Sequence, residues 1–135
     1  MAVLVAQDLQ KTYVSGEARV AALAGVSFEV NPGDFVALMG PSGCGKSTLL
    51  HLCGAMDRAS GGTIRLNDRD LSTLGDDDLT RVRREQVGFV FQFFNLLPTL
   101  TVTDNIALPC LLAGMKASEA EQRATALAAR VGIAH

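Results

Sequence analysis

The stretch "GPSGCGKSTLL", residues 40–50, constrains the fold of this 135-residue chain more than any other. From Gly40 to Ser47 it has the complete G-x-x-x-x-G-K-[ST] spacing of a phosphate-binding loop. The run "FVALM" (35–39) before it is apolar at every position, which predicts a strand covered on both faces, as in a parallel sheet. After it, apolar residues follow a helical period up to Gly54, which predicts the end of a helix. Strand, loop and helix in this order are the context in which the motif binds phosphate.

Each residue type in the loop has a predicted role. The glycines allow turns that aim backbone N–H groups inward, and the helix adds its positive dipole end. Lys46 can reach the β- and γ-phosphates, Ser47 is a predicted Mg²⁺ ligand, and Thr48 is expected to support the α-phosphate. The alternative, a glycine turn beside a lysine without a ligand, fits this context poorly. The predicted phosphate-binding residues are Gly40, Pro41, Ser42, Gly43, Cys44, Gly45, Lys46, Ser47 and Thr48.

Three further segments are predicted to be strands. Val26, Phe28 and Val30 alternate with polar residues, which is the pattern of a half-buried strand. "GGTIRLN" (61–67) alternates in the same way, and "VGFVF" (87–91) is a second strand of wholly apolar type.

Three helices are expected after the loop helix. The first follows Asp76–Asp78, whose charges favour a helix N-terminus and are read as solvated charges, not as a metal site. The second begins with a capping pattern of Thr101 and Asp104, and Pro109 should kink or end it. The third is predicted to begin with a capping box of Ser118 and Glu121 and to end at Gly132. Its apolar stripe consists of Ala124, Leu127, Ala128 and Val131.

Composition excludes several functional classes. The net charge of −2 argues against nucleic-acid binding, and "RVRRE" (81–85) is better explained as a solvated helix face. Three cysteines without a C-x-x-C suit a reducing cytosol, and Cys44 is read as a small filler and not as a redox switch. The uncharged run 86–103 holds polar residues and a proline that disfavour a membrane span, so a soluble chain without a signal peptide is expected. Neither His51 nor His135 has a partner that suggests catalysis.

The segments "VSFEVNPGDFVALMGPSGCGKSTLL" and "VGFVFQFFNLLPTLTVTDNIALP" resemble the ATP-binding subunits of ABC transporters. The resemblance covers essentially the whole chain and is nearest to the branch that serves lipoprotein release and macrolide export. The loop alone would indicate only a P-loop NTPase, whereas the stretch 87–109 is more specific. The implied fold is an α/β, ABC-type P-loop NTPase core with an N-terminal antiparallel β subdomain and the start of a helical subdomain. Residues 1–97 would form the β subdomain and core, and residues 98–135 the helical part.

The resemblance also implies cofactors, partners and two further site residues. ATP and Mg²⁺ would bind, Tyr13 would stack on adenine, and Gln92 would contact Mg²⁺ and the attacking water. From the residues alone, packing is the favoured reading of Tyr13, and Gln92 is better explained as the polar end of a strand. The expected partners are a membrane-spanning transporter subunit and a second ATP-binding subunit, with the chain peripheral at the cytoplasmic face of the plasma membrane. The apolar segment 93–100 would line a groove for the membrane partner, or belong to the core.

Other motifs of the family are missing from the 135 residues. There is no L-S-G-G-Q signature, no apolar strand ending in Asp-Glu, no D-loop and no switch histidine. Hydrolysis needs a carboxylate to orient water and an Asp to hold the Mg²⁺ shell. We therefore expect the N-terminal part of a longer ATPase, which binds ATP with little or no hydrolysis. A catalytically silent nucleotide-binding or interaction module shares every motif found and stays open. An ATPase of DNA repair or a small-molecule kinase fits less well.

Overall fold

The computed structural model describes residues 1–133. The chain divides into two compact units, one from Met1 to Gly88 and one that begins at Phe89. His135 lies outside the described residues. The subdomain division expected between residues 97 and 98 stays a prediction. In chain order the elements are β1 (Leu4–Ser15), β2 (Ala18–Val30), α1 (Lys46–Cys53), β3 (Gly61–Leu66), β4 (Arg69–Asp70), the short 3₁₀ helix η1 (Leu71–Thr73), α2 (Asp76–Glu85), α3 (Val102–Leu112) and α4 (Ala117–Arg130).

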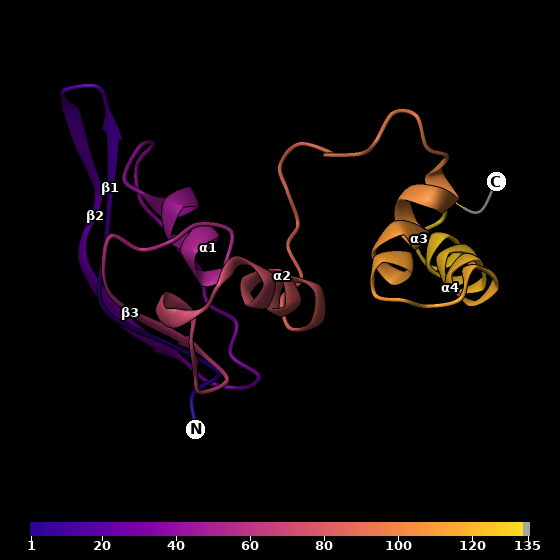
Figure 1. Ribbon diagram of the computed structural model, residues 1–135, viewed down its shortest axis with the longest axis horizontal. Helices are drawn as coiled ribbons and strands as arrows, with labels where there is room; N and C mark the ends of the chain where they lie inside the picture. Colours follow the sequence, from indigo (N-terminus) through magenta and orange to yellow (C-terminus); the bar gives the residue numbers. More distant parts are fainter. Residues whose placement is uncertain (134–135) are drawn as a thin grey trace. The chain divides into compact units, whose positions relative to one another are not determined.

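The N-terminal unit is built on one antiparallel sheet with strand order β2-β1-β3-β4 (Figure 1). This confirms the expected antiparallel β subdomain. The predicted alternation also holds, since Val26, Phe28 and Val30 are half-buried while Ser27 and Glu29 are exposed. β1 and β2 keep pairing as far as Ser15 and Ala18, so the hairpin extends well beyond the segment that the alternation identified.

One apolar core joins the sheet to α1 and α2. Leu49 and Leu52 of α1 pack in the same buried cluster as Leu9 of β1, and Leu79 and Val82 of α2 belong to it as well. Burying a side chain such as Leu52 contributes about 1.5–3 kcal/mol. α1 ends at Gly54 and α2 starts with three aspartates in its first turn, both as expected. The helix that carries the loop is therefore fixed on the sheet by its apolar side.

The two wholly apolar runs do not form strands among the described residues, and this prediction is wrong. Residues 35–39 and 87–91 have no regular secondary structure, and Phe35 and Val90 are 98% and 95% exposed. A strand needs neighbours for its N–H and C=O groups as well as apolar side chains. No described strand pairs with either run, so the composition alone does not create one.

The C-terminal unit is a pair of helices, α3 and α4, that packs through small residues. Ala107 of α3 lies in one buried cluster with Ala120 and Ala124 of α4. The expected capping box is confirmed at the start of α3, where the Asp104 N–H donates to Thr101 Oγ1 at 3.1 Å and the Thr101 N–H to Asp104 Oδ2 at 3.3 Å.

Three details of these helices differ from expectation. Pro109 does not end α3, which continues to Leu112, because a proline in the last turn removes only one N–H; a kink at Pro109 stays a prediction. α4 begins at Ala117 after an N-cap of Lys116 without a side-chain cap, so the capping box of Ser118 and Glu121 is wrong. The buried stripe of α4 consists of alanines, and Leu127 and Val131 are exposed. Within residues 1–133, no helix has both the length and the apolar character to cross a membrane.

Candidate nucleotide-binding site

The loop of residues 40–45 turns into α1 through a left-handed glycine. Gly45 is the N-cap of α1 with φ 92° and ψ 6°, a conformation that side chains other than glycine rarely adopt. A Cβ at this position would lie 2.4 Å from the carbonyl oxygen of Ala22 on β2. Gly45 is thus required twice, for its backbone angle and for its close approach to β2.

Lys46 is the first residue of α1 and folds back across the loop. Its Nζ donates to the carbonyl oxygens of Gly40 at 2.8 Å and Pro41 at 2.6 Å, and it lies 3.6 Å from Cys44 Sγ. No acidic side chain among residues 1–133 pairs with Lys46. Its positive charge is therefore held at the loop by neutral acceptors and stays uncompensated.

A hollow of about 340 Å³ lies against the loop and the first turn of α1. Gly43, with φ 78°, borders it, and a Cβ there would meet nothing within 4 Å, so the backbone is open on this side. The hollow is lined by Ala22, Ser42, Gly43, Gly45, Lys46, Ser47 and Thr48. The structure thus brings together most of the residues that the motif identified, from one contiguous segment and one neighbouring strand.

The donors around this hollow match an anion. The first bonded N–H of the helix is that of Leu49, which donates to the Gly45 carbonyl at 2.9 Å. The N–H groups of Lys46, Ser47 and Thr48 precede it and have no partner within the helix. Three N–H groups without a partner in the helix, the helix dipole and an ammonium group without a carboxylate partner fit a phosphate group. Ser47 is exposed, and its hydroxyl offers an oxygen atom of the type that Mg²⁺ accepts as a ligand.

Tyr13 lies near the end of β1 in the same unit and is held by a charged pair. Its hydroxyl donates to Asp57 Oδ2 at 3.1 Å, and Lys11 Nζ lies 2.6 Å from Asp57 Oδ1. Burial disfavours the charged form of Asp57. Hydrogen bonds from Lys11, the Arg58 backbone N–H and Tyr13, together with the Lys11 charge, outweigh it and lower the pKa of this carboxyl. Lys11 and Asp57 were not among the expected site residues.

Gln92 belongs to the C-terminal unit, where it is exposed at a bend. Its expected contact with Mg²⁺ and water stays a prediction, as does the role of the apolar segment that follows it. Part of that segment, Leu96, Leu97 and Leu100, borders an apolar hollow of about 310 Å³ with Ile106 of α3.

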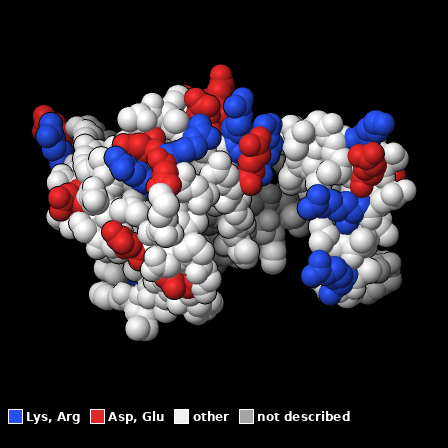
Figure 2. Space-filling view, turned by 90° about the horizontal axis from the view of Figure 1, so that it is seen from below, with Lys and Arg blue, Asp and Glu red and all other residues white. Residues whose placement is uncertain are grey.

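A nucleic-acid site calls for a basic patch or stripe on the surface. On the face shown in Figure 2, Lys and Arg are interspersed with Asp and Glu, and the net charge of the chain is −2. Arg83, from the basic run of α2, donates to the Ala55 carbonyl at 2.7 Å and to Thr80, so it is engaged within the fold. Residues 1–133 hold no cluster of three His, Cys, Asp or Glu side chains suited to a metal ion.

A glycine-rich loop with G-x-x-x-x-G-K-[ST] spacing that opens a helix is characteristic of the phosphate-binding-loop class of nucleotide-binding proteins. Residues 23–135 match the protein family described as ABC transporter, and the chain therefore belongs to this family.

Curated relatives support the same assignment. The chain is 48% identical over 126 residues to an uncharacterized ABC transporter ATP-binding protein of Thermotoga maritima, covering 93% of this chain and 54% of that protein. It is 46% identical over 132 residues to the lipoprotein-releasing system ATP-binding protein LolD of Geobacter metallireducens, covering 98% and 59%. It is 45% identical over 127 residues to the macrolide export ATP-binding/permease protein MacB of Marinobacter nauticus, covering 94% and 20%. The chain thus spans little more than half of the first two and a fifth of the third.

A solved structure shares the fold. The ATP-binding cassette MJ0796, in a dimeric post-hydrolysis state bound to ADP and Pi, superposes with a TM-score of 0.84 at 40% identity. The match covers 90% of this chain and 53% of that one. Together with the relatives, it confirms the expected resemblance to the lipoprotein-release and macrolide-export branch and the ABC-type fold.

Proposed function

We propose that this chain binds Mg²⁺-ATP through the loop of residues 40–48, as the ATP-binding part of an ABC transporter. The observation that carries the proposal is the hollow at the start of α1, with the unpaired charge of Lys46 and three free N–H groups around it. The neutral acceptors that hold Lys46 are weaker partners than a phosphate oxygen, because the phosphate adds the attraction between opposite charges.

The roles of the other residues follow from the chemistry of each side chain. Ser47 would hold Mg²⁺, which when bound neutralises part of the phosphate charge, and Thr48 would support the α-phosphate. Tyr13 would stack on the adenine ring. Gln92 would act at the metal and at the attacking water, as the family resemblance implies.

We further propose that residues 1–135 alone turn over little or no ATP. Phosphoryl transfer to water needs a carboxylate that orients the water, and the sequence contains no apolar strand ending in Asp-Glu. In this proposal the chain lies at the cytoplasmic face of the membrane and acts with a membrane-spanning subunit and a second ATP-binding subunit, without nucleic acid. Relatives named for lipoprotein release and macrolide export support transport as the process.

The test is equilibrium binding and single-turnover hydrolysis of labelled ATP with Mg²⁺ by residues 1–135, beside Lys46→Ala. A hydrogen bond to a charged group contributes about 1.5–3 kcal/mol, so we expect the dissociation constant to rise about 10- to 100-fold in the variant. Lys116→Ala is the matched control, since it removes the same charge from an exposed residue of the other unit and should leave binding unchanged. Unaltered binding by Lys46→Ala would refute the proposal. Hydrolysis that depends on Lys46 would show that a carboxylate acts from another position.

A further inference from the structure

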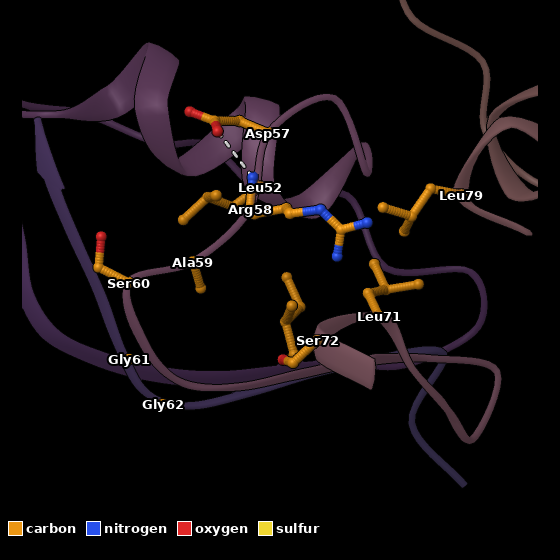
Figure 3. A pocket seen from close by; sticks show the side chains of 11 residues that line it. Leu52, Asp57, Arg58, Ala59, Ser60, Gly61, Gly62, Leu71, Ser72 and Leu79 are labelled. Carbon is orange, nitrogen blue, oxygen red and sulfur yellow. Dashed lines mark hydrogen bonds between the residues drawn. The ribbon is translucent and has the colours of Figure 1, made fainter. Parts of the chain in front are cut away.

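Asp57 joins two side chains of β1 that lie 46 and 44 residues before it in the sequence. Oδ1 of this carboxylate accepts from Lys11 Nζ at 2.6 Å, and Oδ2 accepts from the Tyr13 hydroxyl at 3.1 Å. The backbone N–H of Arg58 donates to Oδ1 at 2.7 Å and fixes the carboxylate itself (Figure 3). Both oxygens are thus occupied, one by a cation and the other by the phenol.

Lys11 holds Tyr13 at a second point. Its Nζ lies over the aromatic ring, 4.9 Å from the centroid, within the range of a cation–π contact. The Lys11 side chain is 11% exposed and also donates to the Arg58 carbonyl at 2.7 Å, so it has little freedom to leave. Tyr13 is therefore fixed by its hydroxyl and by one face of its ring.

We propose that Asp57 and Lys11 position the Tyr13 ring so that its opposite face receives the base of a nucleotide whose phosphates bind at residues 42–48. This inference rests on the proposed function. Tyr13 is 42% exposed although its hydroxyl and one ring face are engaged, which leaves aromatic surface for a ligand. Bases stack readily on such rings.

The same short helix fixes both ends of this arrangement. α1 begins with Lys46 at the phosphate end and stops at Cys53, four residues before Asp57. Eight residues of α-helix span about 12 Å. The turn after the helix is hydrogen-bonded to it, since the N–H of Met56 donates to the His51 carbonyl at 2.8 Å. Because α1 is packed on the sheet, the distance between the loop and the Tyr13 ring is set before any ligand binds.

Because the Tyr13 ring is already fixed, binding does not have to order this side chain and loses less conformational entropy. Ordering one side chain at an interface weakens binding by an amount equivalent to about a two- to tenfold change in affinity. Asp57→Asn keeps the shape of the side chain and removes its charge. We therefore expect it to raise the dissociation constant for Mg²⁺-ATP about two- to tenfold.

The test compares Mg²⁺-ATP with Mg²⁺-tripolyphosphate, which has the phosphates and no base, on residues 1–135. Tyr13 is the single tyrosine and the chain has no tryptophan, so the intrinsic emission reports on this ring directly. In the unmodified chain we expect ATP to bind more tightly than tripolyphosphate and to change the emission. Asp57→Asn should weaken the binding of ATP and leave the binding of tripolyphosphate unchanged. Unchanged tripolyphosphate binding also shows that the variant is folded. In a Tyr13→Leu background, which has no tyrosine emission and in which binding is measured with labelled ATP, Asp57→Asn should have no further effect on the dissociation constant for ATP.

Asp76→Asn is the matched control. Asp76 forms an ion pair with Arg58 at 2.7 Å in the same unit and does not touch Tyr13. Loss of its charge should therefore leave the binding of both ligands unchanged. If Asp57→Asn lost affinity for ATP and for tripolyphosphate equally, the inference would be overturned. Unchanged ATP binding in that variant would overturn it as well. A chain that binds both ligands equally well would refute the role of Tyr13 and leave the phosphate site standing. Failure to bind either ligand would refute the proposed function and this inference with it.

Discussion

Gly45 and Gly43 separate the stability of the phosphate loop from its binding function. Both have positive φ, 92° and 78°, so alanine at either position carries similar backbone strain, about 1–3 kcal/mol. Either substitution also lowers the entropy of the unfolded chain by a similar amount. The two effects nearly cancel when the variants are compared with each other.

What differs is the space around the new methyl group. At Gly45 it would lie 2.4 Å from the Ala22 carbonyl oxygen and 3.0 Å from Leu23 Cδ2, and the first of these contacts is backbone. At Gly43 it meets no atom within 4 Å. Overpacking costs about 1–3 kcal/mol. We expect Gly45→Ala to lower the free energy of unfolding by about that much more than Gly43→Ala does.

Urea unfolding followed by the Tyr13 emission measures this difference in the N-terminal unit alone, because the single tyrosine lies there. Gly43 lines the hollow, so Gly43→Ala should weaken binding of Mg²⁺-tripolyphosphate although it lowers the stability less than Gly45→Ala. Equal losses of stability in the two variants, or a larger loss for Gly43→Ala, would show that the contact between the loop and β2 does not determine the stability.

Four further results are expected. Leu52→Ala should lower the free energy of unfolding of the N-terminal unit by about 2–5 kcal/mol in urea denaturation, because the side chain is fully buried. Thr101→Ala should destabilise α3 by about 0.5–2 kcal/mol through loss of its capping box, as measured by hydrogen exchange. The lowered pKa of Asp57 stabilises the fold above the ordinary carboxyl range, so acid titration below about pH 4 should destabilise the parent chain more than Asp57→Asn. Burial raises the pKa of Cys53 to about 11, so alkylation at pH 8 should modify it later than the exposed Cys44.

The sequence was sufficient for the parts of the site that depend on local backbone. The spacing of residues 40–47 identified the loop, and the structure places its helix start and its left-handed Gly45 where the motif requires them. The capping box at Thr101 was found for the same reason. Each of these features is set by residues within a few positions of one another, so a linear pattern contains the whole cause.

Contacts between distant segments were not predictable in this way. Lys11 lies two positions before Tyr13, which places both on one side of a strand, but nothing local connects either residue to Asp57. For residues 35–39 the prediction failed in the opposite way: their composition satisfies every local criterion for a strand, yet they do not form one. Pairing is a property of two segments, and among the described residues no second segment supplies it.

The loop nevertheless has its hollow and its free donors although the run before it is unpaired. Its support comes from the other side: Leu49 and Leu52 anchor α1 in the core, and Gly45 packs against the Ala22 carbonyl of β2. The unpaired run contributes neither of these contacts. Substitutions that make residues 35–39 more polar, such as Phe35→Ser, should therefore leave tripolyphosphate binding intact, since Phe35 is almost wholly exposed. The same reasoning places the structural origin of phosphate binding in α1 and β2, and a loss of binding in Phe35→Ser would contradict it.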